Sequence, residues 1–269
     1  DDSTDPFPDP GAAPCHSRFC PLFQRVAPPF LALTCATATL GTAALLLALA
    51  KRPQAWQSRV LVAQLALGTA LFAAPLPALA AGIAWGWHVG TGSCRLAHLL
   101  WHWSLFAQAL LVGSGLWGSV WTRWDPRSQR LAVALWAVAL LLAVPAALAA
   151  GTVGGTGCVR RSVGILSPAY LLHLCILLGL QLLLPAGLLA VPRCRASRWA
   201  GGGASRVLFF GLWAPYGVAL ALELLLHARL LEPTCDALER LDHALGLSEG
   251  LGVLHCGLAP PVLLLAQLC

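Results

Sequence analysis

The chain contains long apolar runs that no charged side chain interrupts. Five of them reach the roughly 20 apolar residues that a membrane-spanning helix needs, and they cover residues 30–50, 60–94, 96–122, 131–159 and 162–192. Only 10% of the 269 residues are charged, against about 25% in an ordinary soluble domain. This composition excludes a soluble enzyme, a disordered chain and a nucleic-acid-binding protein, and it indicates an integral membrane protein.

Two further apolar runs bring the expected number of membrane spans to seven. Residues 207–228 form a span if Glu223 is accommodated, and residues 250–269 are apolar to the last residue. We therefore predict an all-α membrane protein, a seven-transmembrane helix bundle, with six spans as the alternative if the last run only dips into the membrane. The expected spans are residues 30–50, 60–81, 94–120, 131–150, 168–191, 207–228 and 246–269.

The loops between these spans predict the orientation of the chain. Three alternate loops, residues 51–59, 121–130 and 193–206, together hold ten basic residues and one acidic residue. Lys and Arg accumulate in cytoplasmic loops, so we expect these loops inside the cell and the N-terminal segment, residues 1–29, outside it. The net charge of +6 follows from this loop bias.

The sequence contains no Met, even at its first position, which indicates a trimmed chain. We therefore expect a truncated N-terminal segment, and a cytoplasmic tail that is absent after Cys269. Cys194 and Cys269 lie at the cytoplasmic side of the expected spans, where cysteines are sometimes palmitoylated.

Five of the ten cysteines fall on the predicted outer side, where an oxidising environment permits disulfides. Cys94 opens the third span and Cys158 lies in the loop after the fourth, so a bridge between them would hold that loop over the bundle. Cys235 precedes the seventh span, and its partner is either Cys15 or Cys20. Such a bridge would join the first helix of the bundle to the last.

Acidic residues also gather on the predicted outer side. We expect a negative rim that recruits basic partners and speeds their association, with a solvated surface without a partner as the alternative. Glu223 and Glu249, near the outer ends of their spans, either face a basic ligand group or reach to the interface, and His227 can pair with Glu223. The candidate ligand-binding acids are Asp5, Asp9, Glu232, Asp236, Glu239, Asp242 and Glu223.

Two groups of histidines and cysteines lie close enough in sequence to be candidate metal ligands. His98 and His102 share one face of the third span, but no third ligand lies beside them in sequence, so we expect them to line a pocket. The spacing of Cys15, His16 and Cys20 indicates zinc only weakly. No order of Ser, His and Asp places a nucleophile beside a base, and no P-loop pattern occurs. We expect no enzyme, no catalytic residue, no metal and no cofactor.

Several strings of residues match a known pattern in order along the chain. Ala12-Ala13-Pro14-Cys15-His16-Ser17 precedes the first span, and Phe106-Ala107-Gln108-Ala109-Leu110-Leu111 lies in the third. Leu254-His255-Cys256, followed by Pro260, lies in the seventh. Over nearly its whole length, the chain therefore resembles the atypical chemokine receptors of the Duffy type, within the rhodopsin-like superfamily of seven-helix receptors.

The resemblance implies helix motifs of that superfamily. Trp136 matches its tryptophan in the fourth span, and Trp213 with Pro215 matches its Trp-x-Pro in the sixth. The sulfated tyrosines of a Duffy-type N-terminal segment have no counterpart, because the first tyrosine is Tyr170, although Phe7-Pro8-Asp9 resembles part of that segment.

Three departures from signalling members of the superfamily indicate, through the resemblance, that the usual activation switch is missing. Gly68 stands where the sodium-binding aspartate would lie, and the residues from Ser119 to Trp124 contain no Asp-Arg-Tyr. The seventh span has Ala259-Pro260 and then Leu264 in place of Asn-Pro-x-x-Tyr. These departures predict no productive G-protein coupling.

The resemblance also implies two disulfides, Cys94–Cys158 and Cys15–Cys235, and a receptor that binds both CXC and CC chemokines. It implies that the receptor internalises, transports or buffers them, as a multi-pass protein of the plasma membrane and of early and recycling endosomes. Membrane lipid is then a partner, nucleic acid is not, and homo- or hetero-oligomers are left open. The alternatives are a conventional G-protein-coupled chemokine receptor and a transporter or channel, although paired intramembrane charges and inverted repeats are missing.

Overall fold

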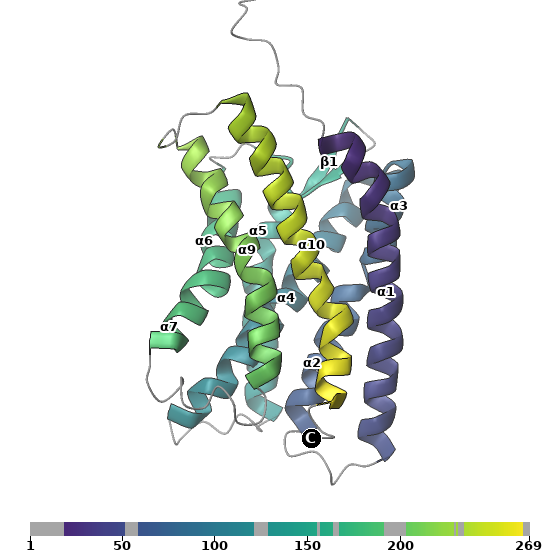
Figure 1. Cartoon of the computed structure of the whole chain (residues 1–269), viewed down its shortest axis with the longest axis vertical. Coiled ribbons are helices and arrows are strands. Elements are labelled where there is room, and N and C mark those ends of the chain that lie inside the picture. The colour runs from purple at the N-terminus through teal and green to yellow at the C-terminus, as the bar shows by residue number, and fades with distance from the viewer. Residues whose placement is uncertain are drawn as a thin grey trace, which may run out of the picture.

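The computed structural model describes residues 19–51, 59–120, 129–154, 157–163, 167–190, 203–228, 230 and 234–265. Within these ranges, seven helical stretches are long and apolar enough to cross a membrane. They pack side by side into one bundle (Figure 1). The seven-transmembrane helix bundle predicted from the apolar runs is therefore confirmed.

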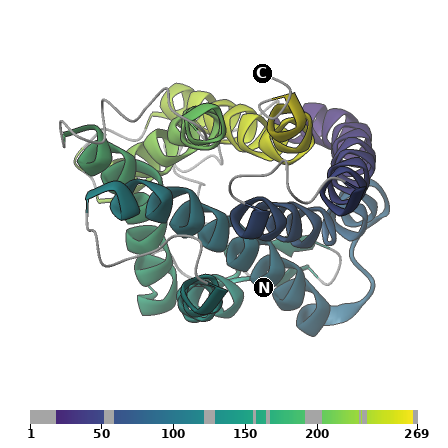
Figure 2. The ribbon, with the colours of Figure 1, turned by 90° about the horizontal axis from the view of Figure 1, so that it is seen from below.

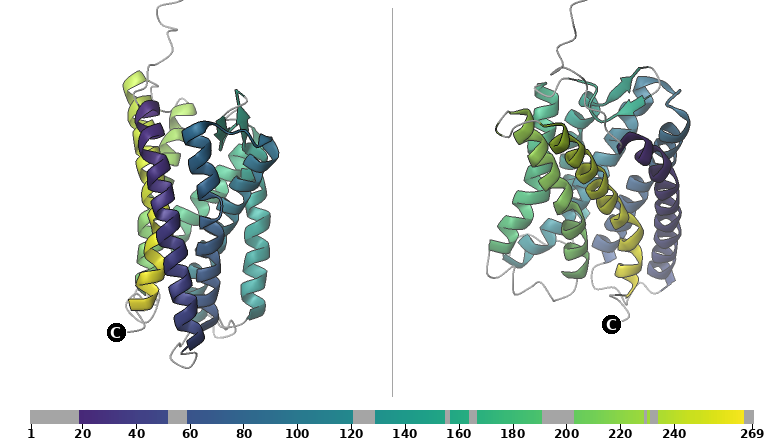
Figure 3. Two further views of the ribbon diagram at one scale, coloured as in Figure 1. Left: turned by 90° about the vertical axis from the view of Figure 1, so that its right-hand side faces the viewer. Right: turned by 45° about the horizontal axis from the view of Figure 1, so that its top comes forward.

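The seven spans alternate in direction through the bundle (Figure 3). In chain order they are α1 (Phe19–Lys51), α2 (Arg59–Ala73), α3 (Leu76–Trp85), α4 (Gly90–Val120), α5 (Gln129–Ala149), β1 (Gly151–Val153), β2 (Gly157–Val159), α6 (Pro168–Leu178), the π-helix η2 (Gly179–Leu183), α7 (Leu184–Ala190), α9 (Gly203–His227) and α10 (Cys235–Leu265). Two spans are composite: α2 continues into α3, and α6 continues through η2 into α7.

The antiparallel strands β1 and β2 form a small hairpin at one end of the bundle, which we call the hairpin end. Helices α1 and α10 both begin at this end and finish at the opposite end (Figure 1). Seen along the bundle, α10 lies between α1 and α9 (Figure 2). The first and last helices therefore pack against each other and close the ring.

Two helices extend further than the expected spans. Helix α1 begins at Phe19 and continues through Pro28 and Pro29, so the last part of the expected N-terminal segment 1–29 is helical. Helix α10 begins at Cys235 and includes the acidic residues before residue 246. The sequence criterion detected charge-free runs, but a helix can continue beyond the membrane, where water solvates its charged side chains.

The second span is broken between Ala73 and Leu76, where Pro75 starts α3. Proline has no backbone N–H and crowds the preceding turn, so the α-helix changes direction there. In the fifth span, the wider π-helical turn η2 holds the fully buried side chain of Gln181. Continuous apolar runs in the sequence did not predict either irregularity.

Close packing of α9 against α10 depends on a glycine. Trp213 of α9 is fully buried, and its ring lies directly against Gly252 of α10. A Cβ atom at position 252 would lie 2.6 Å from the indole ring, which is closer than real Cβ contacts. Gly252 thus permits the two helices to approach each other at the buried tryptophan.

Gly252→Ala is expected to lower the melting temperature of the detergent-purified protein. The added methyl group forces an overpacked core to shift, which costs about 1–3 kcal/mol. Gly211→Ala is the matched control on α9, because nothing lies within 4 Å of a Cβ there, and alanine favours a helix by about 0.5–1 kcal/mol. Equal melting temperatures for the two variants would contradict this packing.

Candidate functional site

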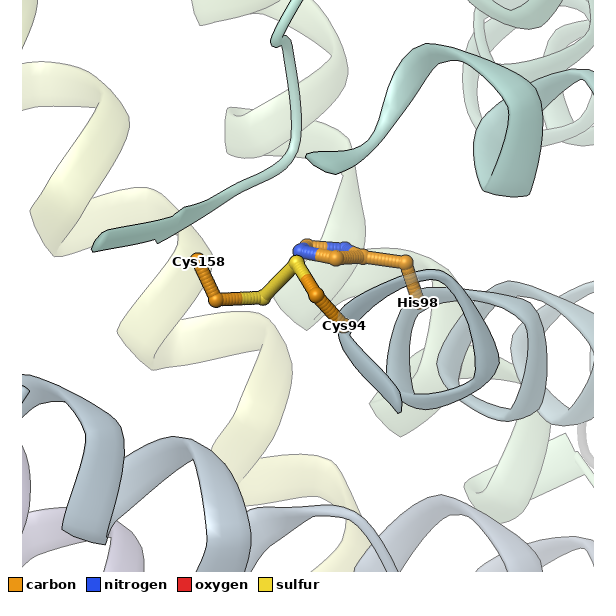
Figure 4. Close-up of side chains that lie close together, drawn as sticks. All are labelled: Cys94, His98 and Cys158. Atoms are coloured by element: carbon orange, nitrogen blue, oxygen red, sulfur yellow. A yellow bond between two sulfur atoms is a disulfide. The ribbon is translucent and has the colours of Figure 1, made fainter. Parts of the chain in front are cut away.

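A disulfide fixes the hairpin to the bundle. Cys94, near the start of α4, is bonded to Cys158 of β2. His98 lies beside this bridge (Figure 4), and its donor atom lies within 4.8 Å of both sulfur atoms. The sulfur atoms are bonded to each other and are not thiolates, so the three residues do not offer a metal site while the bridge is intact.

Polar contacts hold the hairpin in place beside the bridge. The hydroxyl groups of Thr91 on α4 and Thr152 on β1 lie 2.8 Å apart. The Nε of Arg95 donates to the carbonyl oxygen of Ala150 at 3.2 Å. The disulfide and these bonds together determine where the chain emerges after β2.

Two arginines that follow β2 reach between the helices. Arg160 lies 3.8 Å from the carboxylate of Glu223 on α9 and 3.8 Å from that of Glu249 on α10. Arg161 lies 3.7 Å from the other carboxylate oxygen of Glu223. Arg160 also donates to the hydroxyl of Tyr216, and the hydroxyl of Tyr170 donates to Glu223 at 3.4 Å. We call Arg160, Arg161, Glu223 and Glu249 the ion-pair cluster.

Glu223 at the centre of the ion-pair cluster is closed to solvent, whereas the side chains of Arg160, Arg161 and Glu249 are 25%, 33% and 35% exposed. Glu223, Tyr170 and Tyr216 are each at most 6% exposed. Burial alone lowers the pKa of the Arg160 guanidinium, but Tyr216, Glu249 and Glu223 raise it by more, and the net direction is upward. Arg160 therefore remains charged, and its charge is balanced by carboxylates of the same chain.

The acids predicted as ligand contacts fall into separate groups. Asp236, Glu239 and Asp242 lie on the first turns of α10 at the hairpin end, and the exposed Asp236 accepts a hydrogen bond from Arg240 at 2.9 Å. Glu223 is apart from them and buried in the ion-pair cluster. Asp5, Asp9 and Glu232 lie outside the described residues.

The sequence predicted His227 or a basic ligand group as the partner of Glu223. The side chain of His227 lies outside the described part of the structure, and the described partners, Arg160 and Arg161, come from a loop far away in sequence. No spacing rule connects these positions. The one available signal was that two arginines stood on a predicted outer side otherwise rich in acids.

The expected second disulfide is described at one of its two positions. Cys235 is disulfide-bonded and begins α10, whereas Cys15 lies outside the described residues. Cys20, the alternative partner, is a free and exposed cysteine.

The two histidines of α4 pack with a third that the sequence did not indicate. The ring centroids of His102 and His173 of α6 lie 4.5 Å apart at right angles, and those of His98 and His102 lie 6.1 Å apart. His102 and His173 are at most 5% exposed. These rings form a buried aromatic contact between α4 and α6.

A hydrogen-bonded network joins three helices deeper in the bundle. Trp213 of α9 donates to Nδ1 of His255 on α10 at 3.3 Å, and Nε2 of His255 lies 2.9 Å from Oε1 of Gln108 on α4. Nδ1 accepts a bond, so Nε2 carries the hydrogen and donates it to Gln108. We call Gln108, Trp213 and His255 the glutamine–histidine network.

This network occupies the space beside Gly68. A Cβ atom at position 68 would lie 2.6 Å from Cγ of Gln108, so a larger side chain has no room there. A further hydrogen bond links α5 to α2, because the indole N–H of Trp136 donates to Oε1 of Gln64 at 2.7 Å. The residues from 121 to 124, where the sequence has no Asp-Arg-Tyr, lie outside the described residues.

Replacing both bridge cysteines, Cys94→Ser and Cys158→Ser, should destabilise the purified protein. The bridge closes a loop with a sequence separation of 64, and its loss typically costs about 2–4 kcal/mol. Thermal unfolding in detergent measures the effect. Cys175→Ser is the control, because Cys175 is free and exposed, and a loss of stability no greater than in this control would disprove the role of the bridge.

Comparison with known proteins identifies the family, although no family model matches the chain. Atypical chemokine receptor 1 from Homo sapiens is 36% identical over 282 residues, covering 98% of this chain and 82% of the relative. The receptors of that name from Macaca mulatta and Bos taurus are 35% and 34% identical, and cover 100% and 96% of this chain. The chain belongs to the atypical chemokine receptor 1 family.

Proposed function

We propose that this chain binds CXC and CC chemokines at the hairpin end, faces that end to the cell exterior, and carries them into the cell without activating a G protein. Membership of the atypical chemokine receptor 1 family is the observation that carries the proposal. On this proposal the receptor resides in the plasma membrane and in early and recycling endosomes.

The distribution of charged residues supports this orientation. Lys51 ends α1, while Arg59 and Arg130 lie in the first turns of α2 and α5, so all three lie at the end opposite the hairpin. Basic residues accumulate on the cytoplasmic side of membrane proteins. The hairpin end and the start of α1 then face outwards, where disulfides persist.

The first turns of α10 supply a negative surface for a basic ligand. Asp236, Glu239 and Asp242 lie on this extension, beyond the apolar part of the helix, with Asp236 exposed and the other two partly exposed. Chemokines are small basic proteins, so these acids attract them through long-range electrostatics. Cys235 at the start of the extension is disulfide-bonded, and we propose Cys15 as its partner.

The glutamine–histidine network supports a receptor without the usual switch. Gln108 fills the space beside Gly68, where the resemblance places the sodium-binding aspartate of signalling receptors. Neutral hydrogen bonds then connect α4, α9 and α10 at this depth. The alternative is a conventional G-protein-coupled chemokine receptor, in which a ligand shifts these helices through other contacts.

Neutralising the acids of α10 should weaken chemokine binding. We expect the triple variant Asp236→Asn, Glu239→Gln and Asp242→Asn to bind at least about 3-fold more weakly, since each of three ionic contacts near the surface contributes about 0.2 kcal/mol or more. Its affinity should also depend less on salt, because fewer charges attract the ligand. Radioligand binding to cells at several ionic strengths measures both effects.

Arg240→Gln is the matched control, because it removes a positive charge from the same surface. It should leave chemokine affinity unchanged or raise it. If the triple variant keeps wild-type affinity at low salt, the electrostatic part of the proposal is wrong.

Cells that express the receptor should take up labelled CXC and CC chemokines without nucleotide exchange on G proteins. A conventional chemokine receptor in the same cells serves as the positive control for exchange. Exchange stimulated through this chain would favour the conventional alternative, and ligand-dependent ion flux would favour a transporter or channel. An absence of chemokine binding would refute the proposal.

A further inference from the structure

In the ion-pair cluster, the carboxylates of Glu223 and Glu249 are paired with two arginines of the same chain. We propose that Arg160 and Arg161 are an internal occupant of this acidic subsite: they hold Glu223 and Glu249 so that a cationic segment of a ligand does not bind there. A basic ligand is then restricted to the acids on the first turns of α10. This inference rests on the proposed chemokine-binding function.

The cluster balances its own charges. Two guanidinium groups face two carboxylates, and every distance between paired N and O atoms lies between 3.7 and 3.8 Å. The guanidinium of Arg160 also lies 5.7 Å from the ring centroid of Tyr216, and that of Arg161 lies 5.5 Å from that of Tyr170. A ligand cation would therefore meet carboxylates that are already neutralised by guanidinium groups lying beside aromatic rings.

The arginines are also tethered in place. Arg160 follows the disulfide-bonded Cys158 by two residues, and the hairpin is hydrogen-bonded to α4. A group held on a short tether competes at an effective concentration of about millimolar or above. A ligand cation at far lower concentration does not displace such an intramolecular partner without much stronger contacts.

The exposed Asp236–Arg240 pair on the first turns of α10 offers a contrast. The side chain of Asp236 is 79% exposed, and its partner Arg240 is 82% exposed. A surface ion pair of this kind contributes about 0–1 kcal/mol, so a ligand cation can replace it. The side chain of Glu223 is only 8% exposed and that of Glu249 is 35% exposed. Both carboxylates are paired with Arg160, so a ligand cation that binds either of them competes with that arginine.

The test compares one CC chemokine in full length with the same chemokine lacking the segment before its first cysteine, which carries the positively charged N-terminus. For the wild-type receptor, truncation should change Kd by less than about 3-fold. For the Arg160→Gln, Arg161→Gln variant, the released carboxylates attract that segment, and truncation should weaken binding about 10-fold, or about 1.4 kcal/mol.

Two further variants control for charge. Arg160→Lys with Arg161→Lys keeps both cations and should behave as wild type. Adding Glu223→Gln and Glu249→Gln to the first variant removes the carboxylates, and the sensitivity to truncation should disappear again. If the Arg160→Gln, Arg161→Gln variant does not reach the cell surface, Arg161→Gln alone can be used, because it leaves the Arg160 pairs intact. For this single variant, truncation of the chemokine should raise Kd by about 3-fold.

The outcomes separate this inference from the function on which it rests. If truncation of the chemokine weakens binding equally for the wild type and for the Arg160→Gln, Arg161→Gln variant, the proposal of an internal occupant is wrong, while chemokine binding stands. No binding of either chemokine form by the wild type would overturn the proposed function instead.

Discussion

A backbone amide inside a bilayer has no water to bind, so each N–H and C=O must find a partner within the protein. In the described residues, this constraint is met by seven helical stretches whose ends lie near the two faces of the bundle. Prolines are accommodated within it in different ways. Pro75 starts a new helix, whereas Pro145 and Pro215 remain inside α5 and α9.

The hairpin end shows how a short polar structure organises a much larger apolar one. The Cys94–Cys158 bridge ties β2 to α4, and the chain after β2 places Arg160 between α9 and α10. Glu223 is nearly buried, and an unpaired carboxylate there would be costly. The arginines thus make the acid tolerable and at the same time connect the loop to two helices.

Deeper in the bundle, neutral groups take the place of charges. Gln108, His255 and Trp213 bond in series across α4, α10 and α9, and Gly68 leaves the space that Gln108 fills. The network and the ion-pair cluster both attach to α9 and α10, one at depth and one at the hairpin end. These two helices are therefore held at two levels.

The sequence by itself determined the number of spans, the all-α bundle and the resemblance to its family, because apolar runs and charged loops are local features that the membrane selects directly. It also indicated Cys94 and Cys158 as partners, since both were expected on the oxidising side. Only the tertiary structure decided that α10 begins at Cys235, that Arg160 and Arg161 hold Glu223, and that His255 meets Gln108. Those pairings join residues far apart in the chain, and which side chains meet depends on how the helices rotate and approach, which hydrophobic runs do not encode.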